Sequence, residues 1–233
     1  EYLARNYQVG KGLRWGIAGR NLEKLERVRS HLEGIDPGAA SLSLLVGESN
    51  DLESLKSIAQ QTKVICTTVG PYLEYGALLV QACIEEGADY CDLTGETPFI
   101  RRMIDSYESQ AIEGGSRIVH CCGFDSIPSD IGCWMLQEHA INTQGARCED
   151  VTLYAGKTKG GMSGGTIASM VGLIEKSIAD KSIRRTLGHP YALNPKGTWR
   201  GKDGADQQDV RWDEDLKCWT GPFVMAGINT RVV

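Results

Sequence analysis

Residues 119–130 read V-H-C-C-G-F-D-S-I-P-S-D, in which a short apolar run ends in a glycine and Asp125 and Asp130 bracket Ser126 and a proline. A strand that ends in such a turn places polar groups at its carboxyl end, which is the edge of an open α/β sheet where ligands bind. The alternative is a plain strand-to-helix connection in which Ser126 or Asp125 only caps the helix. Because capping accounts for one polar residue more readily than for four, the stretch favours a ligand site.

Outward from this stretch, short apolar runs alternate with amphipathic segments between residue 13 and about residue 139. The alternation indicates βα units, so we expect an α/β fold with a Rossmann-type, mostly parallel sheet. Strands are predicted at 13–18, 41–46, 64–69, 90–93 and 117–122. Helices are predicted at 21–32, 51–60, 75–86, 98–112 and 127–138.

Residues 1–7 indicate the end of a further helix directly before the first of these strands. In a dinucleotide-binding unit, that helix follows a strand and a glycine-rich turn that holds the pyrophosphate. The sequence contains neither, and the usual strand order places the absent strand in the middle of the sheet. We therefore expect a fragment of a longer protein, which alone is poorly stable or pairs the two flanking strands directly.

The sequence pattern changes beyond residue 145. Residues 150–155 predict a strand of a second layer, and an apolar helix is predicted at 167–178. The glycine-rich stretch between them, 156–165, is either an anion site at the helix amino terminus or a flexible connection. Residues 187–222 are expected to form irregular structure around a substrate cleft or an oligomer surface.

The composition is that of a globular protein, with 41% hydrophobic residues and a net charge of −5. The sequence has no cluster of basic residues of the kind that binds nucleic acid. No apolar run reaches the roughly 18 residues that span a bilayer and no secretory leader is seen, so the default expectation is a cytoplasmic protein.

The eight cysteines form no C-x-x-C pair. We interpret five as buried free thiols and assign no metal site; these five are Cys66, Cys83, Cys91, Cys121 and Cys133.

At the end of the first predicted strand, the sequence A-G-R-N contains Arg20 and Asn21. Arg20 stands where NAD-preferring folds carry an acidic ribose-binding residue. An arginine there suits the extra phosphate of NADP, because its planar guanidinium can bind phosphate through two hydrogen bonds. The alternative is a solvated residue at a helix start. After the next strand, Asp51 is better explained as a helix cap.

Two more polar turns follow predicted strands. In T-T-V-G-P-Y (67–72), Gly70 permits close backbone approach and Pro71 blocks continuation of the strand. The sequence Y-C-D-L-T-G-E (90–96) adds three polar residues at the same sheet edge, namely Asp92, Thr94 and Glu96. His120 has apolar neighbours, so we interpret it as an inward or satisfied histidine rather than a general base.

The combination of W-G-I-A-G-R-N, T-T-V-G-P-Y, Y-C-D-L-T-G-E and H-C-C-G-F-D-S-I-P-S-D resembles the saccharopine dehydrogenase-like superfamily, and within it the trans-acting enoyl reductases. The resemblance covers nearly the whole chain. It implies an incomplete NAD(P)-binding Rossmann domain at 1–140 and a partial second α/β domain at 141–233 for substrate and dimer contacts. It also assigns three groups of residues to the cofactor: Arg20 and Asn21 to the adenosine phosphate, Gly70, Pro71 and Tyr72 to the turn under the cofactor, and Gly123, Phe124, Asp125 and Ser126 to the nicotinamide turn.

The function that this resemblance implies is hydride transfer from NADPH, with NAD as the other candidate cofactor, to an unsaturated group of a lipid-like or polyketide-type substrate. Asp125, Asp130 and Tyr72 are the candidate catalytic residues. The alternatives are a non-catalytic nucleotide-binding scaffold and a saccharopine-type imine reductase, which needs cationic groups for substrate carboxylates; the candidates are Arg184, Arg185 and Arg200. A homodimer and a partner synthase remain open, and the apolar residues 223–228 fit a dimer surface and a buried strand equally well.

Overall fold

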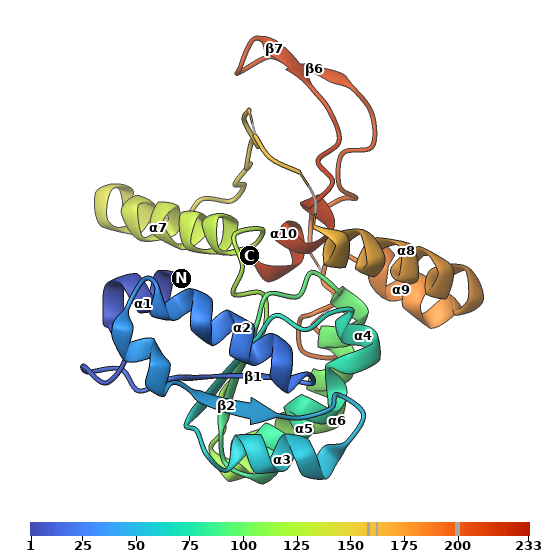
Figure 1. Cartoon of the computed structure of the whole chain (residues 1–233). Coiled ribbons are helices and arrows are strands. Elements are labelled where there is room, and N and C mark those ends of the chain that lie inside the picture. Colours follow the sequence, from blue (N-terminus) through green and yellow to red (C-terminus); the bar gives the residue numbers. More distant parts are fainter. Residues whose placement is uncertain (158, 162, 199–200) are drawn as a thin grey trace.

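The computed structural model describes residues 1–157, 159–161, 163–198 and 201–233 (Figure 1). Its strands are β1 (Gly16–Gly19), β2 (Ser43–Val46), β3 (Val64–Thr67), β4 (Asp89–Asp92), β5 (Ile118–Val119), β6 (Arg211–Asp213) and β7 (Cys218–Thr220). Its helices are α1 (Tyr2–Tyr7), α2 (Leu22–Glu33), the 3-10 turn η1 (Pro37–Ser41), α3 (Leu52–Ala59), α4 (Tyr72–Tyr75), α5 (Ala77–Glu85), α6 (Thr97–Gly114), α7 (Ile127–Gln144), α8 (Gly164–Ala179), α9 (Lys181–Gly188) and α10 (Ala226–Val232).

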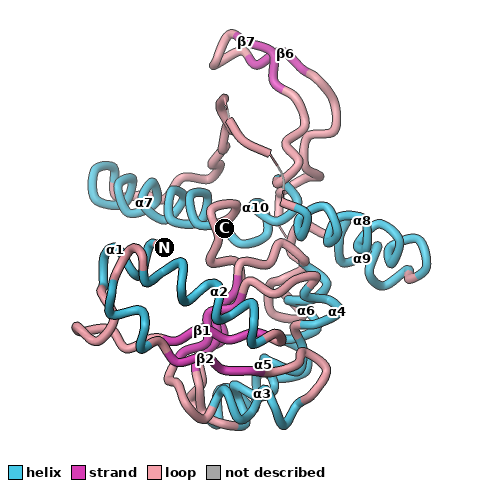
Figure 2. Tube along the Cα trace, viewed as in Figure 1, coloured by secondary structure: helices cyan, strands magenta, loops and turns pink. Residues whose placement is uncertain are grey.

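Helices and strands alternate through the first half of the chain, and β1 to β5 pair only in parallel, which confirms the predicted α/β class (Figure 2). The predicted strand at 117–122 ends early, at Val119, because Cys121 adopts a left-handed φ of 62° that an extended ladder does not accommodate. The predicted strand at 150–155 is wrong. Those residues have no regular structure and no partner strand to take their backbone hydrogen bonds.

The parallel strands form two separate sheets, with the orders β1-β2 and β3-β4-β5. Direct pairing of β1 with β3 was one of the two expected consequences of an absent central strand. Both strands are fully described, and they do not pair. Figure 1 shows α2 and α3 on opposite sides of the β1–β2 pair.

Two apolar cores match these two sheets. The larger core lies between β3–β5 and the helices α4 to α6, with Val80, Tyr90 and Phe99 almost fully buried. The smaller core joins α1 and α2 to η1 and comprises Ala4, Leu32, Ala39 and Leu42. The turns that leave β3, β4 and β5 are therefore built on the better-packed part of the molecule.

The second half of the chain is mainly helical. Figure 1 shows α7 and the α8–α9 pair extending to opposite sides, with the β6–β7 hairpin furthest from the sheets. That hairpin lies within 187–222, where irregular structure was predicted; Trp212 packs edge-on against Trp219 across it, at a ring distance of 5.7 Å. Residues 223–228 form a turn and the start of α10, so the buried-strand alternative is wrong.

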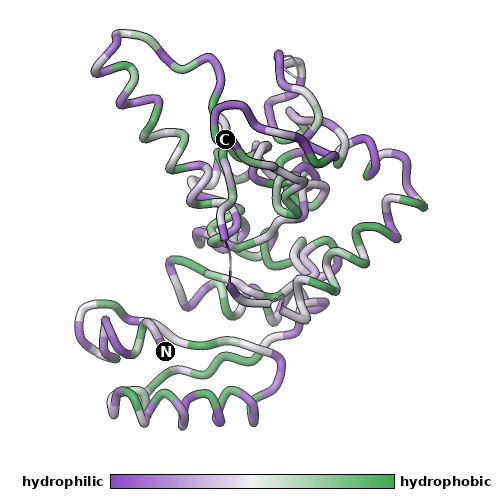
Figure 3. The backbone as a smooth tube through the Cα atoms, turned by 90° about the horizontal axis from the view of Figure 1, so that it is seen from above, coloured by the Kyte–Doolittle hydropathy of each residue, from purple (hydrophilic) through white to green (hydrophobic). Residues whose placement is uncertain are grey.

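Exposed apolar side chains are common on the projecting helices, where hydrophobic and hydrophilic positions alternate along the tube (Figure 3). Among the described residues, no helix is long and apolar enough to cross a membrane. All eight cysteines are free. Cys83 and Cys121 are buried as expected, whereas Cys91 and Cys133 are only partly buried and Cys66 is exposed, because one face of β3 is open.

Candidate functional site

Asp92, at the end of β4, is the centre of a buried hydrogen-bond network. One carboxylate oxygen accepts from the Tyr90 hydroxyl at 2.9 Å and from His120 Nδ1 at 2.7 Å. The other accepts from the backbone N–H groups of Thr94 and Cys121, both at 3.1 Å. The Asp92 side chain has no exposed surface and that of His120 is 9% exposed, which confirms the interpretation of His120 as a satisfied histidine. The network fixes the turn after β5 against the end of β4.

Glu96 organises a second turn. Its carboxylate accepts hydrogen bonds from the backbone N–H groups of Tyr72 and Leu73, both at 2.8 Å, at the amino terminus of α4. It also accepts from the Ser169 hydroxyl of α8 at 2.9 Å. Because Glu96 is only 4% exposed, these three donors replace water around the charge. Glu96 therefore sets the position of the turn 70–72 relative to β4.

The turns after β4 and β5 approach each other closely at Gly123. A Cβ built on Gly123 would lie 2.9 Å from the Leu93 Cβ and 2.7 Å from a carboxylate oxygen of Asp125. A side chain at this position would force the two turns apart, so the sequence requires glycine here. A Cβ built on Gly95 would lie 3.6 Å from the other carboxylate oxygen of Asp125. The Asp125 side chain therefore lies close to two glycines, one from each turn.

Ser126 occupies the cap position of α7, but its side chain makes no capping hydrogen bond. The hydroxyl is buried beside the Cys121 thiol, and it makes no hydrogen bond to an oxygen or nitrogen among the described residues. Capping by Ser126, the alternative to a ligand site, is therefore not observed. In contrast, the Asp51 carboxylate does cap α3, accepting from the N–H groups of Glu53 and Ser54, which confirms the simpler interpretation of that residue.

The three candidate catalytic residues lie in different environments. Tyr72 is buried in the larger core and its hydroxyl donates to the Thr67 carbonyl; burial raises its pKa to about 12. Asp125 is half-buried, and burial raises the pKa of its carboxyl. Asp130 lies in the first turn of α7, where a carboxylate interacts favourably with the helix dipole. Phe124, in the same turn as Asp125, is 88% exposed.

The cofactor candidates after β1 lie on the other sheet. Asn21 caps α2, with its side-chain oxygen accepting from the Lys24 N–H at 2.9 Å. Arg20 is exposed and forms no ion pair within the described part of the chain, so its guanidinium is available for an anion. The structure brings Gly123, Phe124, Asp125 and Ser126 together as one turn and Gly70, Pro71 and Tyr72 as another.

Two functional contacts were not predicted: the pairing of Asp92 with His120, and the role of Glu96 at the turn 70–72. Both acidic residues stood out in the sequence as polar groups at the sheet edge. Their partners depend on strand order, because β4 lies between β3 and β5 and its terminal residues meet turns from both neighbours. The rule that the carboxyl ends of adjacent parallel strands meet is the signal that could have found them.

The structure describes two of the three arginines of the imine-reductase alternative. Arg184 and Arg185 are exposed on α9, and Arg200 lies outside the described residues. The glycine-rich stretch 156–165 also includes two residues, 158 and 162, outside that part of the chain, and α8 after it is capped by the Ser163 side chain.

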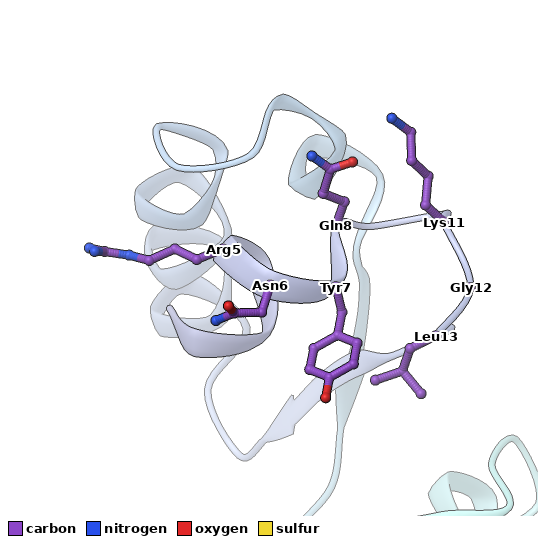
Figure 4. A pocket seen from close by; sticks show the side chains of 7 residues that line it. All are labelled: Arg5, Asn6, Tyr7, Gln8, Lys11, Gly12 and Leu13. Carbon is purple, nitrogen blue, oxygen red and sulfur yellow. The ribbon is translucent and has the colours of Figure 1, made fainter.

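A surface hollow of about 640 Å³ lies elsewhere, in the connection between α1 and β1 (Figure 4). It is lined by Arg5, Asn6, Tyr7, Gln8, Lys11, Gly12 and Leu13. These residues precede β1, whereas Arg20 and the polar turns follow their strands. The hollow therefore shares no residue with the candidate site.

Comparisons with known proteins agree with the motifs. A protein from Mycobacterium tuberculosis (strain ATCC 25618 / H37Rv) that is provisionally named a trans-acting enoyl reductase is 40% identical over 243 residues, a match that covers 100% of this chain and 56% of that protein. A trans-acting enoyl reductase from Mycobacterium bovis (strain BCG / Pasteur 1173P2) is 36% identical over 240 residues, with the same coverage. The chain therefore spans about half the length of the curated relatives that it matches.

Among solved structures, the apo histidine-tagged saccharopine dehydrogenase (L-Glu forming) from Saccharomyces cerevisiae is similar over 55% of this chain and 26% of its own, with a TM-score of 0.41 and 16% identity. The family model described as "Saccharopine dehydrogenase NADP binding domain" matches residues 1–119, which contain both parallel sheets. Because that match covers half of the 233 residues, this chain belongs to the family of saccharopine dehydrogenase NADP-binding domains.

Proposed function

We propose that this protein is an NAD(P)H-dependent oxidoreductase that reduces an enoyl or related unsaturated group of a lipid-like or polyketide-type substrate. The family match supports a nicotinamide cofactor, and the names of the whole-chain relatives support enoyl reduction. The observation that carries the proposal is the tight cradle of turns at the carboxyl ends of β4 and β5. It contains a glycine that permits no side chain, a half-buried carboxyl, and a buried hydroxyl that bonds to no oxygen or nitrogen among the described residues.

The residues present suit a phosphorylated dinucleotide. Arg20 offers the adenosine phosphate a guanidinium that forms no ion pair with any described residue, and Asn21 is its neighbour in the sequence. The turn of Gly70, Pro71 and Tyr72 offers backbone for close approach to the cofactor, and Gly123 to Ser126 offers the same near the nicotinamide. We propose NADP as the preferred cofactor because of Arg20.

Reduction of an enoyl group adds a hydride at one carbon and a proton at its neighbour. When bound, the nicotinamide supplies the hydride chemistry. The protein has to supply the proton, and Asp125 is our first candidate because its raised pKa keeps it protonated over a wider pH range than an exposed aspartate. Tyr72 is a weaker candidate because its hydroxyl is buried against the Thr67 carbonyl. Asp130, in the first turn of α7, is the third.

The same proposal includes the organisation of the chain. Residues 1–140 would bind the nucleotide and residues 141–233 would contact the substrate and a second subunit, although α7 runs continuously through residue 140. A partner synthase that delivers the substrate is also proposed, because the relatives are named as trans-acting enzymes.

The test is calorimetric titration of the natural protein with NADPH and with NADH, for the wild type and for Arg20→Ala. Loss of a charge-assisted phosphate contact should weaken NADPH binding by about 10- to 100-fold and leave NADH binding nearly unchanged. Arg184→Ala, which removes another exposed arginine, is the matched control and should not alter either affinity.

Turnover distinguishes enzyme from scaffold. Oxidation of NADPH with a panel of enoyl thioesters would support the proposal, whereas nucleotide binding without turnover on any member would favour a scaffold. If neither nucleotide binds, the oxidoreductase proposal is wrong.

A further inference from the structure

Glu96 joins three segments that lie far apart in the sequence. It follows β4, it holds the first two N–H groups of α4, and it accepts from Ser169 on α8. One carboxylate oxygen serves both Tyr72 and Ser169, and the other serves Leu73. The turn 70–72 and α8 therefore depend on the same buried carboxylate.

The short helix α4 needs this carboxylate. It contains four residues, and Pro71 at its cap position has no side chain that could accept from the first N–H groups. A helix of one turn is not stable by itself in water, because nucleation costs more than one hydrogen bond returns. The negative charge of Glu96 at the amino terminus also interacts favourably with the helix dipole.

Helix α8 packs on α9, and its direct links to α4 and to the turn after β4 are polar. None of its residues is buried, and the side facing solvent carries the apolar residues Ile167, Val171, Ile174 and Ile178. Besides the bond from Ser169 to Glu96, Lys176 pairs with Glu74 of α4 at 3.1 Å. Ser169 and Lys176 are seven residues apart and lie on the same helix face. Because no residue of α8 is buried, these polar links have a large share in holding α8 against α4 and the turn after β4.

Ser169 also lies directly beside the turn 70–72. A Cβ built on Gly70 would be 3.7 Å from the Ser169 hydroxyl, which is ordinary van der Waals contact. Any ligand that orders the backbone at Gly70 therefore acts next to the bond that holds α8.

We infer that Glu96 is a positioning residue that couples the turn 70–72 to α8, so that nucleotide binding at the turn orders α8. The part of this inference that concerns nucleotide rests on the proposed function. The coupling is reciprocal, since a helix already held in place lowers the cost of ordering the turn on binding. Glu96 thus links the cofactor half of the site to the helix that carries the exposed apolar face.

Hydrogen exchange of the natural protein tests the link without nucleotide. In Ser169→Ala, exchange in α8 should rise about tenfold or more while the amides of Tyr72 and Leu73 remain protected, because only the bond to α8 is lost. In Glu96→Ala, the acceptor of all three hydrogen bonds is removed, so exchange should rise both at 72–75 and in α8. Ser169→Thr keeps the hydroxyl and should restore the wild-type pattern.

Ser177→Ala is the matched control on the same helix. The Ser177 hydroxyl donates only to the Ile174 carbonyl within α8, at 2.7 Å, so its removal should leave the attachment of α8 unchanged. Wild-type exchange of α8 in Ser169→Ala would overturn the inference, as would an effect of Glu96→Ala confined to one segment.

A second arm adds NADPH. In the wild type, NADPH should lower exchange both at 70–75 and in α8. In Ser169→Ala it should still protect 70–75 but should protect α8 about tenfold less. Equal protection of α8 in both proteins would overturn the coupling. If NADPH fails to protect any segment of the wild type, the proposed function fails, while the nucleotide-free arm still decides the role of Glu96.

Discussion

Asp125 illustrates, at the scale of a single residue, a conflict between stability and function. Burial raises the pKa of its carboxyl, so the folded protein holds this proton at pH values where the unfolded chain, with a pKa of about 3.9, has lost it. The free energy of unfolding therefore falls as pH rises through the interval between the two pKa values. At pH values above that interval, the ionised Asp125 carboxylate lowers the free energy of unfolding by its full amount.

We predict that Asp125→Asn raises the melting temperature at neutral pH by about 1–4 °C. This gain should disappear when the pH falls below the pKa that Asp125 has in the unfolded chain. If Asp125 is the proton donor, the same variant should lose about 100-fold or more in turnover. Melting curves from acidic to neutral pH, with the exposed Asp209→Asn as control, test the first part. A gain that does not depend on pH would contradict it.

The sequence indicated which residues of the turns are polar but not which of them pair. Asp125 and Ser126 could be identified as site candidates because they follow an apolar run. The Asp92–His120 pair could not, because it requires the turn after β5 to fold back over the end of β4. Cys66 was wrongly expected to be buried, since the apolar character of a strand does not show which of its faces is covered.

At the scale of elements, Arg231 of α10 holds the end of α9. Its guanidinium donates to the carbonyls of Leu187 at 2.7 Å and His189 at 3.1 Å, and it pairs with Asp206 at 3.2 Å. The last carbonyls of a helix have no partners within the helix, and a cation there interacts favourably with the dipole. The Arg231 side chain is only 5% exposed, and removing it takes a charged donor from all three groups. The His189 carbonyl keeps the Ala192 N–H as a donor, and Asp206 keeps the Thr230 hydroxyl.

We therefore predict that Arg231→Ala lowers the free energy of unfolding by about 3–5 kcal/mol, the usual cost of breaking a buried ion pair. Arg231→Lys should recover only part of the loss, because one ammonium cannot reach all the acceptors of a planar guanidinium. Urea unfolding measures both, and Arg184→Ala on the exposed side of α9 should change stability by about 0.5 kcal/mol or less. A loss below about 1 kcal/mol in Arg231→Ala would show that α10 does not hold α9.

The helices were easier to predict from the sequence than the strands in the second half of the chain. The apolar spacing of α2 and α6 identifies them whatever their neighbours are. The helix predicted at 75–86 is observed as α5, whereas the short helix α4 before it was not predicted. Between them, a Cβ on Gly76 would lie 2.7 Å from the Phe99 ring, a contact with no signal in the local sequence. The strand expected at 150–155 failed because alternation of apolar residues does not supply a partner strand.

At the scale of the whole molecule, the two sheets differ in how well they are supported. The β3–β5 sheet packs on a core of thirteen buried residues, and the α1–α2 region near β1 and β2 packs on a core of four. Among the described strands, β1 pairs only with β2 and β3 pairs only with β4, so one backbone edge of β1 and one of β3 have no partner strand. Stability is therefore expected to be uneven, because local opening is governed by buried apolar contacts and by the exposure of backbone hydrogen bonds.

We predict that the amides of β1 and β2 exchange at least about tenfold faster than those of β4, a difference of about 1.4 kcal/mol in opening free energy. Leu42→Ala, in the smaller core, should accelerate exchange in β1 and β2 but leave β4 unchanged. Val80→Ala, in the larger core, should accelerate exchange in β4. Identical opening free energies in both sheets, or a response of β4 to Leu42→Ala, would mean that the two sheets open as one cooperative unit despite their separate hydrogen-bond ladders. The turns after β4 and β5 would then owe their rigidity to the whole molecule rather than to the larger core beneath them.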